Sequence, residues 1–383
     1  MLWATGTYGG RVGVVTGQTR RRWLLVGAGI AALCSLPAAI GAWPVSAPSV
    51  DPVTLRDRIL AADVTYSGYA ESDGSLGLPD LPAIDNVGAL LGSHTRLRVW
   101  QSPAGSRVDV LTPTGERGLY ETPSGLTTWD FEENVTTSLY GDPGLRLPRA
   151  ADLVPPRLAD RLLGGPRGSE RLETLAARRV AGISAVGLRL VPSDPDTLIG
   201  HVDVWADPRT GLPLEVTVTG RDGGGPGLRT RFLDLDQGAG TVAADVLVPP
   251  YPGGGHRAAA HVTAVGDRLD EFAPAILPPR LAGRDSSQIV EGGQALRTYG
   301  DGFSLFGGIA LPGGLGYRVF DAARTAGAQS VDLGNAGRGM VLHTPLLTLL
   351  VVLADRGPSY VLSGPVSADL LTRAARELLG ASP

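Results

Sequence analysis

The stretch TRLRVWQSPAGSRVDVL, residues 95–111, carries the pattern that decides the fold class. Leu97 and Val99 alternate with polar or large residues, and Val108 and Val110 do the same after a Ser-Pro-Ala-Gly turn. A period of two places alternate side chains on opposite faces of a strand. The stretch therefore predicts two antiparallel strands joined by a tight turn, with one apolar face and one polar face.

The same alternation returns further along the chain, so the predicted sheet extends well beyond one hairpin. Its later apolar positions are Leu188 and Leu190, then Val202 and Val204, then Leu214 and Val216. Short helices are predicted at Thr54–Ala62 and near Ala150–Leu163, where the apolar residues follow a helical period. Many alternating strands with few helices favour an α+β fold built on an antiparallel sheet.

A Pro-rich break at Pro274–Arg284 separates this region from a second one. After it the apolar pattern resumes at Tyr299–Phe306, Tyr317–Phe320 and Gly339–His343, followed by an apolar run at Leu346–Ala354. That run is too short for a helix to cross a membrane and is predicted to be a strand buried on both faces. The predicted organisation is a sheet domain at 51–273, a linker at 274–290 and a smaller carboxy-terminal α+β domain at 291–383.

The first 47 residues are predicted to direct export. A basic cluster, Arg20–Arg22, precedes an apolar run from Trp23 to Trp43. Such a pair is typical of an export signal or an amino-terminal signal anchor. The positive-inside rule leaves the amino terminus in the cytoplasm and places the chain from about Val45 onward outside it. Small residues at Val45–Ala47 suit cleavage, so cleavage and retention as a membrane anchor through residues 23–43 both stay open.

The composition excludes several classes of function. The formal net charge is −4, which argues against a general nucleic-acid binder, because such proteins need a basic face. All 34 basic residues are arginine, which excludes P-loop nucleotide binding and Schiff-base chemistry. Cys34 is the single cysteine, so no intramolecular disulfide forms. Leu33 precedes it where a lipoprotein signal requires a small residue, and Cys34 is therefore predicted not to be lipidated.

Catalytic and metal-binding motifs are absent from the sequence. There is no G-x-S-x-G nucleophile motif, and His256 and His261 lack the four-residue helical spacing of zinc ligands. Four aspartates gather around a predicted hairpin, at Asp194, Asp196, Asp203 and Asp207. An acid–base pair or calcium site there competes with simple solvation of a turn and strand edge. The prediction is a non-enzymatic protein without cofactor or metal.

The apolar face of the predicted sheet has two possible uses. Either the chain's own helices seal it into a closed core, or it stays partly uncovered and forms an apolar cavity. The candidate lining residues are Leu97, Val99, Val108, Val110, Leu188, Leu190, Val202, Val204, Leu214 and Val216. The aromatic candidates for a rim or wall are Trp100, Trp129, Tyr140 and Trp205.

Several stretches resemble the MucB/RseB family, whose amino-terminal domain is related to the lipoprotein carrier LolA. One is residues 95–141, and another is 178–222, where VAG, LRLVP and VDVWADPRTGLPLEV follow one another. TYGDGFSLFGG (298–308) and YVLSGPVSADLLTRAARELL (360–379) are similar to that family's smaller second domain. The resemblance covers most of residues 51–383 and depends on no catalytic residue.

The resemblance implies a curved, half-open antiparallel β-sheet packed with helices, with a cavity for the acyl chain of a lipid or lipoprotein. In that family the protein lies outside the inner membrane and binds the outer part of an anti-sigma factor, which delays its proteolysis. The implied function is a membrane-associated extracytoplasmic binding protein of envelope stress signalling. The alternative is a LolA-like carrier of lipids or lipoproteins, although a retained anchor would prevent shuttling.

Overall fold

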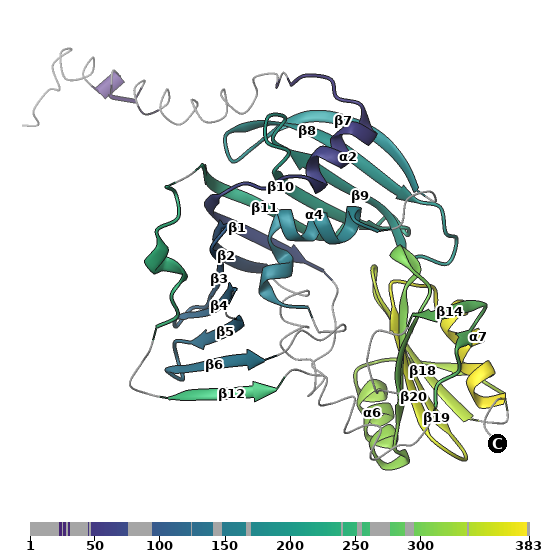
Figure 1. Cartoon of the computed structure of the whole chain (residues 1–383). Coiled ribbons are helices and arrows are strands. Elements are labelled where there is room, and N and C mark those ends of the chain that lie inside the picture. The colour runs from purple at the N-terminus through teal and green to yellow at the C-terminus, as the bar shows by residue number, and fades with distance from the viewer. Residues whose placement is uncertain are drawn as a thin grey trace, which may run out of the picture. The chain divides into compact units, whose positions relative to one another are not determined.

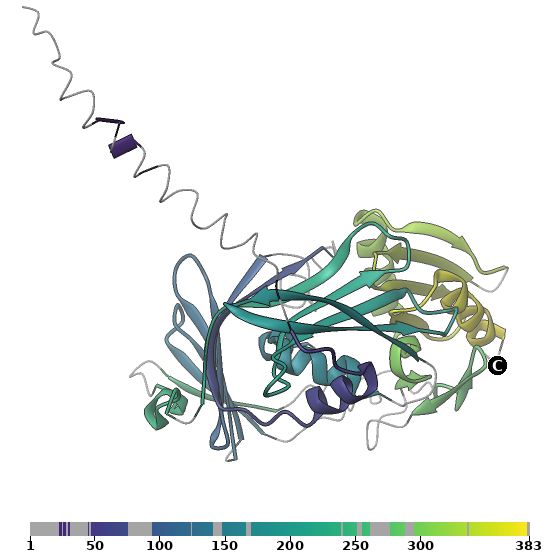
Figure 2. The same ribbon diagram turned by 90° about the horizontal axis from the view of Figure 1, so that it is seen from above.

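The structure is a computed structural model of the 383-residue chain (Figures 1 and 2). It describes residues 23–24, 26–27, 30, 45, 47–75, 94–123, 125–140, 148–165, 170–238, 240–250, 255–260, 276–287, 295–334 and 337–380. The chain divides into two compact units, Met1–Ser46 and Ala47–Pro383.

Little of the predicted export segment belongs to the described residues. Those between Trp23 and Ile30 are helical and exposed. Cys34 and most of the apolar run at 23–43 lie outside the described part. Among the residues that are described, no helix is both long enough and apolar enough to cross a membrane. The signal or anchor therefore stays a prediction.

Twelve strands of the described chain form one curved sheet (Figure 1). Their order across the sheet is β12-β6-β5-β4-β3-β2-β1-β11-β10-β9-β8-β7. The strands are β1 (Tyr66–Gly74), β2 (His94–Ser102), β3 (Gly105–Leu111), β4 (Glu116–Thr122), β5 (Gly125–Asp130), β6 (Val135–Tyr140), β7 (Glu170–Val180), β8 (Ile183–Pro192), β9 (Ile199–Ala206), β10 (Pro213–Gly220), β11 (Pro226–Gln237) and β12 (His256–Ala260).

The hairpin at residues 95–111 forms as its alternation predicts. Leu97 lies opposite Val110 and Val99 opposite Val108, so these four side chains share one face. The turn depends on Gly105, whose φ of +145° is a conformation that side chains rarely adopt. We call the face that carries Leu97 and Val99 the inner face, and the opposite one the outer face.

The sheet is mixed, whereas the sequence predicted an antiparallel one. β12 runs parallel to β6, with His256 opposite Thr136. Hairpins join antiparallel neighbours, but β12 follows β11 in the chain, and six strands separate the two in the sheet. Such a pair needs a crossover instead of a tight turn. The connection includes the short helix η2 (Ala244–Leu247), where the carbonyl of Val246 accepts a hydrogen bond from Arg107 on the outer face.

Helices α2 (Pro52–Leu60) and α4 (Pro155–Leu163) cover part of the inner face (Figures 1 and 2). Each has proline in its first turn, where the missing N–H is not needed. α4 packs on β10 and β11, and α2 packs on β7 and β8. The core beneath them includes Leu55, Ile59 and Leu163 from the helices.

A buried arginine ties the two helices together. The Arg56 guanidinium on α2 donates to the carbonyl oxygen of Leu163 at the end of α4, with an Nε–O distance of 2.9 Å. It also lies 3.6 Å from the carboxylate of Glu170 at the start of β7. The carbonyl of Leu163 is in the last turn of α4 and has no hydrogen-bond partner within the helix. The hydrogen bond from Arg56 provides that partner and fixes where α4 ends.

A second sheet of eight strands follows in the described chain, in the order β13-β14-β15-β16-β20-β19-β18-β17. The strands are β13 (Arg280–Leu281), β14 (Arg284–Ser287), β15 (Leu296–Tyr299), β16 (Phe306–Leu311), β17 (Gln329–Asp332), β18 (Gly337–His343), β19 (Thr348–Ala354) and β20 (Ser359–Gly364). The described chain also contains the short helices η1 (Ala150–Leu153) and η3 (Gly302–Ser304) and the longer helices α6 (Gly313–Thr325) and α7 (Ala368–Gly380). β13 and β14 lie inside 274–290, the segment predicted as a linker.

β19 is buried on both faces, as its apolar run predicts. Leu350 and Val352 belong to the core that α7 covers. Val351 and Leu353 pack on the other side with Phe320 of α6. The two helices thus lie on opposite faces of the second sheet. Tyr317–Phe320 belongs to α6.

The two sheets meet along a hydrogen-bonded and ionic contact. Thr197 pairs with Val366 as an isolated β-bridge. The Arg284 guanidinium lies 2.7 Å from Asp194 and 3.1 Å from Asp196. Hydrogen bonds from Arg284 lower the pKa of Asp194 to about 2. Asp194 and Asp196 therefore serve as the structural contact between the sheets.

Candidate functional site

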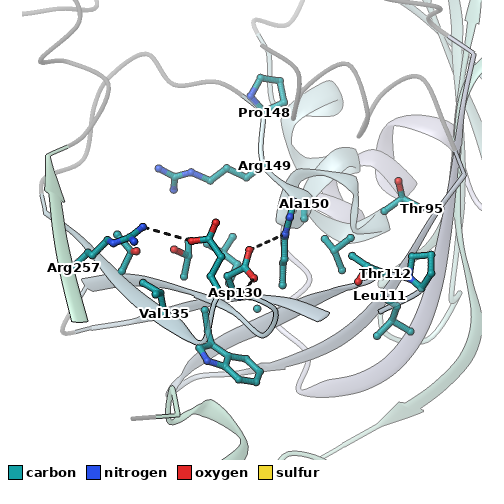
Figure 3. Close-up of a pocket in the computed structure, with 18 of the residues that line it drawn as sticks. Thr95, Leu111, Thr112, Asp130, Val135, Pro148, Arg149, Ala150 and Arg257 are labelled. Carbon is teal, nitrogen blue, oxygen red and sulfur yellow. Dashed lines mark hydrogen bonds and ion pairs between the residues drawn. The ribbon is translucent and has the colours of Figure 1, made fainter. Parts of the chain in front are cut away.

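The uncovered part of the inner face holds a pocket of about 730 Å³ (Figure 3). Its floor is the inner face of β2 to β6, with Arg257 of β12 at one side. Pro148, Arg149 and Ala150, where η1 begins, line the opposite wall (Figure 3). α2 and α4 cover β7 to β11 instead, so the inner face is sealed over one half and open over the other.

The floor of the pocket is partly apolar. Val110, Leu119 and Val135 come from β3, β4 and β6, and cross-strand pairing places them on the inner face. Thr128 and Thr137 lie opposite each other on β5 and β6 and add a methyl and a hydroxyl each. Neighbouring inner-face positions on these strands therefore give a surface suited to an apolar chain with polar groups at its edge.

Charged side chains border the pocket in pairs. Arg117 Nε lies 3.0 Å from an Asp130 carboxylate oxygen, and Arg257 lies 3.5 Å from Glu133. The other Asp130 oxygen accepts hydrogen bonds from the backbone N–H groups of residues 132 and 133, at 2.9 and 3.0 Å. This turn fixes the carboxylate at the end of β5. With Arg149, the lining holds three guanidinium groups and two carboxylates.

The ten residues predicted to line a cavity lie mostly in the packed core. Leu97, Val99, Val108, Leu188, Leu190, Val202, Val204, Leu214 and Val216 are each at most 2% exposed. All nine belong to one core cluster: those on β8 to β10 lie beneath α2 and α4, whereas Leu97, Val99 and Val108 lie on β2 and β3, and η1 contacts β3. Of the ten, Val110 is the one that lines the pocket. The strictest alternation therefore marks the packed core of the sheet and not the pocket.

The four aromatic candidates are spread over the molecule. Trp129 is among the residues around the pocket, but the alternation on β5 turns its side chain to the outer face, where its ring meets Phe131 edge-on at 5.7 Å. Trp100 lies on the outer face beneath the Arg107 guanidinium, 4.9 Å from its carbon. Trp205 lies on the outer face beneath Arg178. The side chain of Tyr140 lies outside the described part of the chain.

The sequence did not single out the charged and threonine residues that border the pocket. The available signal was the mixed character of β4 to β6, where Arg117, Thr128 and Asp130 occupy inner-face positions. Such residues on the inner face indicate a surface that water reaches. The remaining aspartates of the sequence cluster are paired instead: Asp203 lies 2.7 Å from Arg189, and Asp207 lies 3.4 Å from Arg209.

Of the comparisons with known proteins, only the one with solved structures gives matches. No family model matches the chain, and no curated protein does. A MucA/MucB complex from Pseudomonas aeruginosa is 16% identical over 85% of this chain and 97% of that one, with a TM-score of 0.47. MucB alone is 19% identical, with the same coverage and a TM-score of 0.42. A LolA superfamily protein from Nitrosomonas europaea is 11% identical over 52% of this chain and 99% of that one, with a TM-score of 0.23. MucB and LolA-superfamily proteins, which the sequence was predicted to resemble, are thus among the solved structures that this chain resembles.

Proposed function

We propose that this chain is an extracytoplasmic binding protein of the MucB/RseB type, whose pocket takes the acyl chain of a lipid or lipoprotein. The observation that carries the proposal is the pocket on the open half of the inner face. Its volume of about 730 Å³ falls within the range of roughly 300–1,000 Å³ usual for small-molecule sites. The predicted export segment before residue 47 agrees with a place outside the cytoplasm.

The energetics favour an amphiphile in such a pocket. Burial of an acyl chain gains about 0.8 kcal/mol per methylene, so about 14 methylenes gain on the order of 11 kcal/mol before costs. Ordering of the chain and desolvation of the pocket reduce that gain considerably. The guanidinium groups of Arg117, Arg149 and Arg257 at the border suit a carboxylate or phosphate at the polar end.

Replacing Thr128 by tryptophan is expected to abolish uptake of a fluorescent fatty acid while the protein stays folded. Thr128 points from β5 into the pocket, and an indole there fills space that the acyl chain needs. Thr127→Trp is the matched control, because the neighbouring side chain lies on the outer face of the same strand. The measurement is fluorescence titration, with native mass spectrometry of protein purified from membranes. Equal uptake by both variants, or folded wild-type protein that takes up no lipid, would contradict the proposal.

We further propose that the partner is the outer part of a membrane anti-sigma factor, as the sequence resemblance implies. Purification from membranes is then expected to recover a single-pass anti-sigma factor with the chain. The Thr128→Trp variant, whose pocket is filled, separates lipid sensing from simple partner binding. If the protein senses lipid, recovery of the partner changes in this variant; if it only binds the partner, recovery is the same as for the wild type. Transfer of bound lipid or lipoprotein between vesicles, without such a partner, would favour the LolA-like carrier instead.

A further inference from the structure

One row of inner-face residues runs straight across the floor of the pocket, from strand to strand. Leu119 of β4 lies opposite Thr128 of β5, which in turn lies opposite Thr137 of β6. Thr137 lies opposite Arg257 of β12. All four residues line the pocket, and we call this row the lane. Because neighbouring strands are about 4.8 Å apart, the lane is about 14 Å long.

The lane becomes more polar from one end to the other. Leu119 is 7% exposed and belongs to the packed core, as does Val108 of β3, which lies opposite it beyond the pocket. Helix η1 contacts β3 there, so the apolar end of the lane stops against the core. The two threonines offer a methyl and a hydroxyl each, and the exposed Arg257 stands at the other end (Figure 3). Such a gradient suits a molecule with one apolar end and one charged end.

Ion pairs flank the lane on both sides. On one side, the next inward positions of β4 and β5 carry Arg117 and Asp130, which lie opposite each other and are 3.0 Å apart. On the other side, the next inward position of β4 carries Glu121, which pairs with Arg157 of α4. An acyl chain laid over such a pair would remove water from both charges, which costs free energy. The lane between the two pairs is therefore one acyl chain wide.

Arg257 is able to exchange its carboxylate partner. It lies 3.5 Å from Glu133, and the two side chains are 67% and 62% exposed. An exposed pair of this kind contributes little to stability, because water solvates each charge well when the pair separates. Asp130 differs, since two backbone N–H groups of its own turn hold its carboxylate beside Arg117. A carboxylate that arrives at the charged end of the lane therefore replaces Glu133 more readily than Asp130.

We propose that the pocket selects an amphiphile with a single chain and a carboxylate end, which is the chemistry of a free fatty acid. Its chain lies along the lane with the methyl end towards Leu119, and its carboxylate binds Arg257 in place of Glu133. A guanidinium binds a carboxylate through two parallel hydrogen bonds, so one arginine suffices for the head. The inference rests on the proposed function and deepens it, because it names the ligand class and the residue that recognises the head.

Displacement of a fluorescent fatty acid from the full chain tests the ligand class. We expect myristate to compete at least about tenfold better than tetradecanol, which has the same chain but no charge for the guanidinium. Dimyristoyl phosphatidic acid keeps an anionic head but has two chains. It is expected to compete at least about tenfold more weakly than myristate, because its second chain would lie over an ion pair.

Two pairs of variants test the residues at the charged end. Arg257→Gln is expected to weaken myristate binding about tenfold and to leave tetradecanol binding unchanged. Its control is Arg171→Gln, which removes an exposed arginine of β7, outside the pocket. Glu133→Gln is expected to strengthen myristate binding about two- to fivefold, because it removes the carboxylate that competes for Arg257. Its control is Glu132→Gln, which removes the same charge from the neighbouring exposed position of the turn.

Failure of this inference is distinguishable from failure of the proposed function. If neither the fluorescent fatty acid nor myristate binds, the acyl-chain pocket itself is wrong. If myristate binds but tetradecanol or dimyristoyl phosphatidic acid competes equally well, the pocket stands and its selectivity for a single-chain carboxylate is overturned. If Arg257→Gln binds myristate like Arg171→Gln, or Glu133→Gln like Glu132→Gln, the role of Arg257 is overturned, since equal effects report only the general charge.

Discussion

Replacing Val204 by aspartate is expected to unfold the first sheet, whereas Val110→Asp is expected to leave the chain folded. Val204 is fully buried on the inner face of β9, between the strands that carry Leu188 and Val216. An unpaired charge in such a core costs several kcal/mol, against a total stability of about 5–15 kcal/mol for a typical domain. Val110 lines the open pocket, where water still solvates a carboxylate.

Urea denaturation followed by circular dichroism measures the difference between these variants. We expect Val204→Asp to lose its cooperative transition or to shift the midpoint far down, while Val110→Asp keeps a midpoint near that of the wild type. Val110→Asp is also expected to take up fatty acid poorly, because its charge lies where the acyl chain would pack. Comparable losses of stability in both variants would show that the division into a sealed half and an open half is wrong.

The sealed half of the sheet was predictable from sequence because its packing imposes the pattern. Under α2 and α4, most inward positions are apolar, as Leu188, Val202 and Val216 are. The inward Thr230 is buried too, and its hydroxyl donates to the carbonyl oxygen of Leu153. The open half has no such requirement, so Arg117 and Thr128 stand at inward positions there. A search for the most apolar positions therefore finds the core and misses the pocket.

Helix α6 is an element for which local sequence preference gives little support. Gly313, Gly314 and Gly316 open it, and glycine is among the weakest helix formers. The helix is stabilised instead by tertiary packing, since Phe320 and Ala323 lie against β19. Gly316 is needed where it stands, because a Cβ there would overlap the side chain of Ser359. Contacts with distant strands cannot be read from the segment itself.

The aspartate cluster was ambiguous for the same reason. Asp194 and Asp196 are close in sequence and resemble a cation site, yet their partner Arg284 lies about 90 residues further on. Spacing within the hairpin carries no information about that arginine. The family resemblance, by contrast, was recognisable because it depends on motifs that are continuous in sequence, such as VDVWADPRTGLPLEV.

Replacing Gly227 by valine is expected to loosen the contact between the two sheets. Leu346, in the turn between β18 and β19, is 8% exposed and packs into the core of the first sheet. It lies directly against Gly227 of β11, where a Cβ would be 2.6 Å from its Cγ. The valine must displace Leu346, at a cost of about 1–3 kcal/mol for overpacking. Leu346→Ala alone is expected to cost at least about 2 kcal/mol, through the cavity that it leaves.

The double variant decides whether this contact is the cause. Once Leu346 is alanine, Gly227→Val no longer meets a side chain, and valine forms strands better than glycine does. We therefore expect Gly227→Val to be neutral or stabilising in that background, with a coupling of at least about 1 kcal/mol between the two sites. Gly224→Val is the matched control, because a Cβ at Gly224 meets nothing within 4 Å. Calorimetric unfolding measures the free energy of unfolding of each variant. Only a direct contact lets Leu346→Ala remove the cost of Gly227→Val. Strict additivity of the two changes would therefore mean that Leu346 does not hold the sheets together.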